Sequence, residues 1–149
     1  MFGKSRLRDR NEEEVRGYRN ALKLIHEQAA SLPVSEKAIR ELHRLIRGEI
    51  GDGGHYKKIN SDIIEKYPDG RQRVRSKTVE AARVAESMRE MIELWNRSLD
   101  ERWVHPLISM AAFNLDFLCI HPFRDGNGRV SRLLLLLQCR ARGRTKVRD

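Results

Sequence analysis

The sequence predicts an all-α fold, a helical bundle that carries one short β-hairpin. Apolar residues recur at helical spacing through most of the chain, and short breaks separate these periodic segments. One segment of about 20 residues lacks the helical period and contains turn residues. The chain of 149 residues is 40% hydrophobic and 34% charged, which is enough apolar mass to close a core. We therefore expect a single domain over residues 1–149, with its core at about 11–141.

The first two predicted helices have recognisable ends. The first covers residues 11–30, where Asn11 followed by Glu14 is typical of a capping box. In the second helix, Ser35 is expected to cap the start and Gly48 to stop the chain from continuing. Short helices joined by short loops favour a bundle.

Residues 55–76 form the segment without a helical period. Pro68-Asp69-Gly70 stands within it, where a hairpin would turn. Long segments without regular structure are uncommon inside compact domains and are often functional. We therefore predict a hairpin-like flap at about 55–76.

Three more helices follow the flap. We expect them at about 79–97, 106–120 and 127–140, the middle one opening with a proline, which is well tolerated in a first helical turn. The last two helices carry apolar residues on most sides, so we expect both to be buried. The two cysteines, Cys119 and Cys139, are too few for a disulfide framework and have apolar neighbours, so we expect buried, reduced thiols.

Charge and hydropathy exclude several classes of protein. The net charge is +9, with 30 basic against 21 acidic residues, but acids interleave with bases everywhere except in the tail from 140 to 148. This distribution argues against a dedicated nucleic-acid-binding protein. The longest apolar run, Leu133 to Leu137, is far shorter than the roughly 20 residues of a membrane span, and the N-terminus carries no secretory signal. We expect a soluble, cytoplasmic protein without a membrane partner.

The segment between the last two helices, residues 121–132, has a composition that a simple connector does not need. Gly126 and Gly128 would allow successive backbone N–H groups to point into one concavity, and the helix that follows adds the positive end of its dipole. Such an anion nest suits phosphate. Arg129 and Arg132 stand three residues apart on the first turn of that helix, so both can reach further phosphate groups.

Two more side chains of this loop indicate chemistry. A carboxylate at Asp125, close to phosphates, is explained by a divalent cation between them, so the loop predicts a nucleotide together with Mg²⁺. His121 could act as a general base, because histidine titrates near neutral pH. Taken singly, each residue of the loop has a structural explanation as a hinge, a cap, a solvated charge or a core histidine. Their convergence on one short loop favours function, and we interpret Pro122 and Phe123 as the residues that fix the turn and anchor the loop in the core.

The stretch from His121 to Arg132 resembles the signature of the Fic (filamentation induced by cyclic AMP) family, His-Pro-Phe-x-Asp/Glu-Gly-Asn-Gly-Arg-x-x-Arg, at all nine specified positions. A looser resemblance covers most of residues 11–141, including the flap. It implies a Fic-type helical bundle with a hairpin flap. It also implies a protein adenylyltransferase, which moves AMP from Mg-ATP to a Ser, Thr or Tyr hydroxyl of a target protein and releases pyrophosphate.

The resemblance also implies a role for each motif residue. His121 would be the base that deprotonates the target hydroxyl, and Asp125 would be the Mg²⁺ ligand. The flap would pair with an extended segment of the target protein. A branch of the family that phosphorylates its targets has lysine where Gly128 stands, so Gly128 favours adenylylation. The resemblance assigns the anion nest to Gly126, Asn127 and Gly128, and the outer phosphates to Arg129 and Arg132.

The chain departs from the family pattern in its regulation. Many members carry an inhibitory helix with the pattern Ser/Thr-x-x-x-Glu-Gly/Asn, and only near misses occur here, at 61–66 and 76–81. The inhibitory helix would then belong to an antitoxin-like partner, lie elsewhere in a longer protein, or be absent. Family domains usually add a helix beyond the point where this chain ends, so a truncated fragment is one explanation of the missing helix. The oligomeric state is open, and a homodimer is one of the alternatives.

Two functions compete with protein adenylylation. One is a non-catalytic nucleotide-binding module of the same fold, and the other is a toxin component that transfers another nucleotide.

Overall fold

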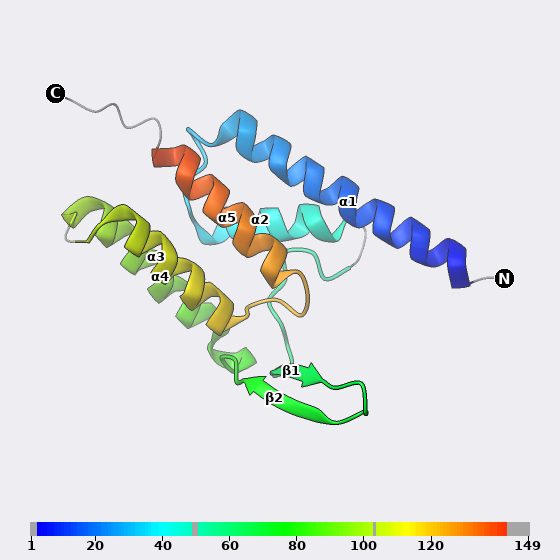
Figure 1. The fold of residues 1–149 in the computed structure, drawn as a ribbon. Helices are drawn as coiled ribbons and strands as arrows, with labels where there is room; N and C mark the ends of the chain where they lie inside the picture. The colour runs from blue at the N-terminus through cyan, green and yellow to red at the C-terminus, as the bar shows by residue number, and fades with distance from the viewer. Residues whose placement is uncertain (1–2, 49–50, 103, 143–149) are drawn as a thin grey trace. The chain divides into compact units, whose positions relative to one another are not determined.

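A computed structural model describes residues 3–48, 51–102 and 104–142, with residues 3–11 and 141–142 given by their backbone alone. Its helices and its small antiparallel hairpin confirm the predicted fold class (Figure 1). In chain order the elements are α1 (Gly3–Gln28), α2 (Glu36–Arg47), β1 (Ile63–Lys66), β2 (Gln72–Ser76), the short 3-10 helix η1 (Ala81–Arg83), α3 (Val84–Glu101), α4 (Pro106–Ile120) and α5 (Asn127–Arg142). The chain divides into two compact units, Met1–His55 with Gly126–Asp149, and Tyr56–Asp125.

The first unit contains α1, α2 and α5, which pack on one another. Glycine at position 17 allows α1 to approach α2 closely, because a Cβ there would overlap the carbonyl oxygen of Leu45. Burial of aliphatic side chains from all three helices supplies the main stabilisation of this unit. These fully buried residues are Ala21, Ile25, Ile39, Leu42, Ile46, Val130, Leu133 and Leu137.

Both ends of α2 agree with the prediction. The Ser35 side chain accepts a hydrogen bond from the Ala38 N–H at 3.2 Å, which satisfies one of the unpaired donors of the first turn. The Gly48 N–H donates to the Leu45 carbonyl at 3.3 Å, and its φ of 55° lies in the region that favours glycine. The two caps therefore fix where α2 begins and ends.

The start of α1 differs from the prediction. The helix begins at Gly3, so Asn11 lies inside it and the predicted capping box is wrong. Residues 4–10 contain neither proline nor glycine and include several good helix formers, so nothing in the sequence stops the helix from extending upstream.

Helix α5 is buried for most of its length. Leu133, Leu134 and Leu137 are at most 1% exposed, and Leu135 and Leu136 are half-buried, which confirms the predicted burial of this helix. None of the described helices combines the length and the apolar composition that a membrane crossing needs.

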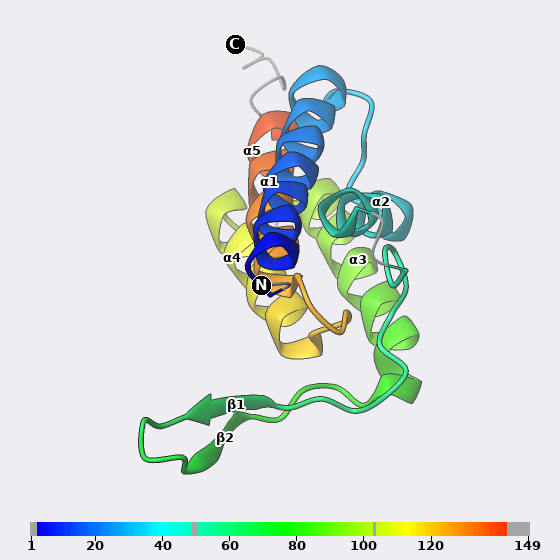
Figure 2. The ribbon, with the colours of Figure 1, turned by 90° about the vertical axis from the view of Figure 1, so that its right-hand side faces the viewer.

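The second unit contains the flap, in which β1 and β2 pair antiparallel and Ile64 stands opposite Val74. The Gly70 N–H donates to the Tyr67 carbonyl at 3.0 Å, and the φ of Gly70 is 84°, so glycine is the residue that this turn requires. Figure 2 shows the hairpin reaching beyond the end of the α3 and α4 pair. The predicted hairpin and its turn are therefore confirmed.

Helices α3 and α4 pack together in the second unit. The rings of Trp95 and Phe113 pack against each other across this contact, with their centroids 5.5 Å apart. Helix α3 runs to Glu101, so the prediction that it ends before Ser98 is wrong. The Ser98 hydroxyl donates to the Trp95 carbonyl at 2.7 Å, which satisfies the side chain without ending the helix.

Only one face of α4 is buried, although the sequence predicts burial on most sides. The buried residues are Ser109, Met110, Phe113, Phe117 and Ile120. Leu107, Ile108 and Leu115 are 66%, 58% and 62% exposed. In the described part of the second unit, α3 is the helix that packs on α4, and one neighbouring helix covers one face. Cys119 and Cys139 are exposed free thiols, so their predicted burial is wrong as well.

Candidate functional site

The backbone at His121 ends helix α4 in an unusual conformation. His121 is the C-cap of α4, with φ of 50° and ψ of 60°, and its N–H donates to the Phe117 carbonyl at 3.0 Å. A left-handed conformation is uncommon outside glycine, and strain of this kind concentrates at functional sites. Within the described residues, the Nδ1 atom of the half-buried imidazole makes no hydrogen bond.

The surroundings of His121 favour its neutral form. Burial lowers the pKa of the imidazole below its ordinary value of 6.5, and the positive charge of Lys57 lowers it further. The backbone of Leu118 and the carboxylate of Asp125 act in the opposite direction without cancelling the shift. At neutral pH the imidazole is therefore unprotonated, which is the form that can accept a proton.

Lys57 is a residue of this site that the sequence did not single out. Its N–H donates to the Pro122 carbonyl at 2.8 Å, and its Nζ donates to the Thr78 hydroxyl at 2.6 Å and to the Ile120 carbonyl at 3.5 Å. The residue is 6% exposed. Burial lowers the pKa of the Lys57 ammonium, and the carboxylate of Asp62 opposes this shift. The contacts of Lys57 therefore flank His121 on both sides along the chain.

The residues that follow His121 hold the loop in the core, as predicted. Pro122 is buried, and Phe123 is 0% exposed. The Phe123 ring lies 5.6 Å from the Tyr56 ring and 6.4 Å from the Phe117 ring, measured between centroids. Asp125, two residues further on, is exposed.

The remaining motif residues belong to the first unit and form the start of α5. The Gly126 carbonyl accepts hydrogen bonds from the N–H groups of Arg129 and Val130, at 3.1 and 3.0 Å, and the φ of Gly126 is 88°. The conformation favours glycine there, and a Cβ at Gly126 would also make a tight contact, 3.1 Å, with the end of the Ile46 side chain. These contacts place Gly126 at the entry to the helix.

The first turn of α5 combines a buried residue with an exposed one. Asn127 is 2% exposed, whereas Gly128 is exposed and a Cβ added to it would meet nothing within 4 Å. The first N–H groups of a helix have no acceptor within the helix, and they form a common binding site for anions. The open space at Gly128 is therefore compatible with the predicted phosphate nest.

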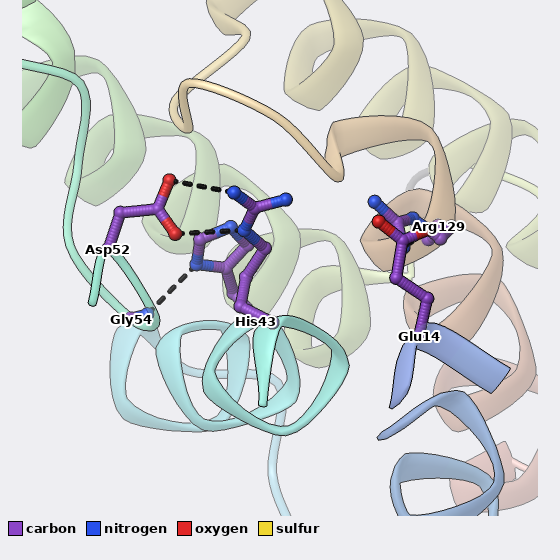
Figure 3. A network of polar contacts seen from close by, with 6 residues as sticks. Glu14, His43, Asp52, Gly54 and Arg129 are labelled. Atoms are coloured by element: carbon purple, nitrogen blue, oxygen red, sulfur yellow. Dashed lines mark hydrogen bonds and ion pairs between the residues drawn. The ribbon is translucent and has the colours of Figure 1, made fainter. Parts of the chain in front are cut away.

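The two motif arginines have different surroundings. Figure 3 shows Glu14 of α1 directed at Arg129, and the ion pair joins Oε2 to Nη1 at 3.0 Å. Both side chains are largely covered, with exposed fractions of 27% for Glu14 and 21% for Arg129. Arg132 is exposed. One arginine is thus restrained by the protein, while the other faces solvent.

A second set of polar side chains, on α2 and in the stretch that follows it, lies next to Gly126. His43 of α2 is fully buried, and its Nδ1 accepts a hydrogen bond from the Gly54 N–H at 2.9 Å (Figure 3). Arg47, also buried, donates to both carboxylate oxygens of Asp52 at 2.8 and 3.1 Å. These bonds tie the glycine-rich stretch after α2 back onto that helix.

The side chains that could act as metal ligands limit how a metal ion could bind. Among the described residues, no group of three or more His, Cys, Asp or Glu side chains could hold a metal ion. Asp125 offers one exposed carboxylate. A single carboxylate fits Mg²⁺ that takes its other ligands from phosphates and water.

Comparison with known proteins agrees with the motif. A model of the Fic/DOC family matches residues 33–139. Proteins named protein adenylyltransferase Fic from Drosophila grimshawi and Drosophila melanogaster are 30% identical over 125 residues, which is 82% of this chain. The chain spans only about a quarter of these relatives, 24% and 23% of their lengths.

Solved structures give the same result for the fold. A Fic domain containing signaling protein from Bacteroides thetaiotaomicron superposes with a TM-score of 0.76 and 25% identity, over 90% of this chain and 50% of that one. A Fic family protein from Desulfovibrio desulfuricans has a TM-score of 0.69 and 27% identity, over 88% of this chain and 37% of that one. With the family model covering most of its length, the chain belongs to the Fic/DOC family.

Proposed function

We propose that this chain transfers AMP from ATP to a hydroxyl side chain of a target protein and releases pyrophosphate. Membership of the Fic/DOC family and similarity to proteins named adenylyltransferase support nucleotidyl transfer. The observation that carries the proposal is His121, a half-buried imidazole with a lowered pKa in a loop that matches the whole family signature. A base that is neutral at neutral pH is what removal of a hydroxyl proton requires.

In the proposed reaction, His121 accepts the proton of a Ser, Thr or Tyr hydroxyl while the hydroxyl oxygen attacks the α-phosphorus of ATP. A P–O bond forms to the target, the bond from the α-phosphorus to the bridging oxygen breaks, and pyrophosphate leaves with that electron pair. Such a reaction needs positioning and charge stabilisation more than covalent catalysis. The backbone N–H groups of Gly126, Asn127 and Gly128 would stabilise the phosphates at the start of α5.

Charged side chains of the motif would complete phosphate binding. Arg129 and Arg132 would hold the outer phosphates, and the ion pair with Glu14 limits the motion of Arg129. Asp125 would hold Mg²⁺, which neutralises charge on the phosphates when it is bound. The exposure of the Asp125 carboxylate supports this role, because phosphates and water must complete the coordination shell.

The surroundings of Gly128 support AMP transfer over phosphoryl transfer. A side chain at this position would enter open space at the first turn of α5. The lysine found here in phosphorylating relatives would add bulk and positive charge to that space, whereas glycine leaves it to the substrate.

The flap would bind the target protein. Strand β2 is exposed along its whole length, and an open strand edge can pair with an extended peptide. We also propose that the two units act as one Fic domain, since the family match runs across both of them.

Transfer of label from ATP tests the proposed function. The purified chain is incubated with Mg²⁺, a cell lysate and ATP labelled at the α-phosphate, and a parallel reaction uses ATP labelled at the γ-phosphate. We expect lysate protein to acquire the α-label and not the γ-label. The His121→Ala variant should lose transfer and retain ATP binding, because the base takes no part in holding the phosphates. His26→Ala, at an exposed histidine of α1, is the matched control and should transfer at the normal rate.

Three results would contradict the proposal. Transfer of the γ-label would indicate phosphorylation. Transfer that persists in His121→Ala would remove the base from the mechanism. ATP binding without any transfer to lysate protein would indicate a non-catalytic nucleotide-binding module.

A further inference from the structure

The two ends of the flap are joined by hydrogen bonds at its base. The Thr78 hydroxyl donates to the Ser61 carbonyl at 2.6 Å, and the Thr78 N–H donates to the Asp62 carboxylate at 3.3 Å. The Ala81 N–H donates to the Asn60 side chain at 2.8 Å. The chain entering the flap is therefore held against the chain leaving it.

Lys57 connects this base to the backbone around His121. Its Nζ donates to the Thr78 hydroxyl, which in turn donates to Ser61. The same Nζ reaches the Ile120 carbonyl, directly before His121, and the Lys57 N–H donates to the Pro122 carbonyl, directly after it. One residue therefore contacts the base of the flap and both neighbours of the histidine.

Packing alone does not explain a lysine at this position. Burial of an ammonium group is unfavourable unless its hydrogen bonds are satisfied, and Lys57 is 6% exposed. A methionine could fill a similar volume without that cost. The Thr78 and Ile120 acceptors offset the cost of burial, and they lie on the two segments that must be aligned with each other for catalysis.

We propose that Lys57 is a positioning residue that fixes the base of the flap to the backbone on either side of His121, so that a target segment bound by the flap meets the imidazole in one register. This inference rests on the proposed function and deepens it. The residue touches neither ATP nor the reacting hydroxyl in this account, and it acts through Thr78, Ile120 and Pro122.

The charge of Lys57 has a second effect on the same histidine. Lys57 and Asp125 are the charged groups that act on the His121 imidazole, with opposite effects, and Asp62 acts on Lys57. The positive charge of Lys57 disfavours the imidazolium. Loss of this charge should therefore raise the pKa of His121, which moves the acid limb of the transfer rate to higher pH.

Three variants separate positioning from charge. Lys57→Met removes the two Nζ hydrogen bonds and the charge but keeps the backbone bond to Pro122, Lys57→Arg retains the charge, and Thr78→Val removes the acceptor hydroxyl at similar volume. Lys58→Met is the matched control, because Lys58 is the exposed neighbouring lysine. Each variant is studied as the full chain by NMR titration of His121, by hydrogen exchange of the Thr78 amide and by transfer to lysate protein.

We expect the Thr78 amide to exchange about tenfold faster in Lys57→Met and in Thr78→Val, since both variants remove the charge-assisted hydrogen bond between Lys57 and Thr78, and Thr78→Val also removes the bond to Ser61. The pKa of His121 should rise in Lys57→Met and stay low in Lys57→Arg and Thr78→Val. The lysate concentration that gives half-maximal labelling should rise about tenfold in Lys57→Met while the KM for ATP is unchanged. Lys58→Met should match the wild type in every measurement.

The inference is overturned if Lys57→Met leaves both the His121 titration and the Thr78 exchange unchanged. It is also overturned if the KM for ATP rises together with the half-maximal lysate concentration, because that result would indicate a general loss of structure. If Lys57→Met does not fold, unchanged Thr78 exchange in Thr78→Val overturns the inference instead. Titration and exchange need no turnover, so they test Lys57 even where a lack of label transfer has refuted the proposed function.

Discussion

At the scale of single residues, the two glycines of the motif have different structural roles. Gly126 has a φ of 88° and faces the Ile46 side chain, whereas Gly128 lies in the first turn of α5 beside open space. We expect Gly126→Ala to lower the free energy of unfolding by about 1–2 kcal/mol, which is the usual cost of left-handed backbone with a side chain. Gly128→Ala should leave it unchanged or raise it slightly, because alanine is the better helix former. Urea denaturation of both variants measures the difference.

The difference between the two substitutions makes this prediction specific. Equal destabilisation by the two substitutions would contradict it. Under the proposed function, Gly128→Ala should still weaken ATP binding, since its methyl group enters the space assigned to the phosphates. Gly128→Ala would then bind ATP more weakly without losing stability.

The ion pair between Glu14 and Arg129 also supports a prediction. Glu14→Gln removes a carboxylate that lies 3.0 Å from a largely covered guanidinium, and loss of a partner charge at a group partly shielded from water is destabilising. We expect a loss of about 1 kcal/mol in the free energy of unfolding, after allowing for partial exposure of both groups. The measurement is chemical denaturation at low and at high salt, where the loss should shrink as screening increases.

Glu27→Gln is the control for this variant. Glu27 pairs with Lys23 on the same helix at 3.8 Å, and both side chains are more than half exposed. Exposed pairs of this kind contribute little, so Glu27→Gln should denature like the wild type. A similar loss in both variants would show that the contact with Arg129 has no special weight.

The sequence predicts the role of a residue well when the partners of that residue are close to it along the chain, and poorly when they are far away. The caps at Ser35 and Gly48 and the motif loop were predictable because each is a local pattern. The roles of Glu14 and Lys57 were not predictable, since their partners stand far away in the sequence. The presence of a charged residue does not indicate which distant residue it contacts. The local pattern assigns Glu14 to a capping box, but Glu14 pairs with Arg129.

At the scale of elements, helix α2 is joined to the stretch that follows it by Arg47 and Asp52. The hydrogen bond from Arg47 holds the pKa of the Asp52 carboxyl below its ordinary value of 3.8, and burial opposes this shift. A carboxyl with a lowered pKa in the folded state stabilises the fold fully above its ordinary pKa, and the contribution is lost as pH falls through the folded value. The contact should therefore stabilise the chain at neutral pH and fade below about pH 4.

Comparison with Asp52→Asn tests this pH dependence. At neutral pH the variant should unfold at a lower urea concentration than the wild type. The gap between their midpoints should narrow at the lowest pH at which both chains stay folded, because the wild-type carboxyl is then protonated as well. A gap that does not change with pH would assign the effect to packing rather than to charge.

The existence of the helices was easier to predict than their limits or their buried faces. Periodicity predicted α2, and long apolar segments predicted α4 and α5, but α1 begins earlier than predicted and α3 ends later. In α4 the apolar residues lie all round the helix, so the sequence contains no periodic signal that separates the buried face from the exposed one. Which face is covered depends on the tertiary contact with α3, and periodicity does not report such contacts.

At the scale of the whole molecule, the second unit exposes several large apolar side chains on α4 and α3. Leu107, Ile108 and Leu115 are more than half exposed, and Leu94 of α3 is 50% exposed. A mostly apolar hollow of about 260 Å³ lies between the two helices, with Leu94, Ile108 and Ala112 among its lining residues. Exposed apolar surface of this kind binds hydrophobic probes and favours self-association.

We therefore expect the folded chain to enhance the fluorescence of anilinonaphthalene sulfonate (ANS) and to self-associate as its concentration rises. The double substitution Ile108→Gln with Leu115→Gln should reduce both effects several-fold while changing the free energy of unfolding by less than about 1 kcal/mol, because exposed side chains contribute little to the core.

Val15→Gln is the control for this double variant. Val15 is 61% exposed on α1, in the other unit, and its substitution should leave the fluorescence unchanged. A loss of fluorescence in the control, or none in the double variant, would place the dye elsewhere. Because the dye is anionic and the net charge is +9, the titration is repeated at high salt, where binding that depends on apolar area persists and binding that depends on charge weakens.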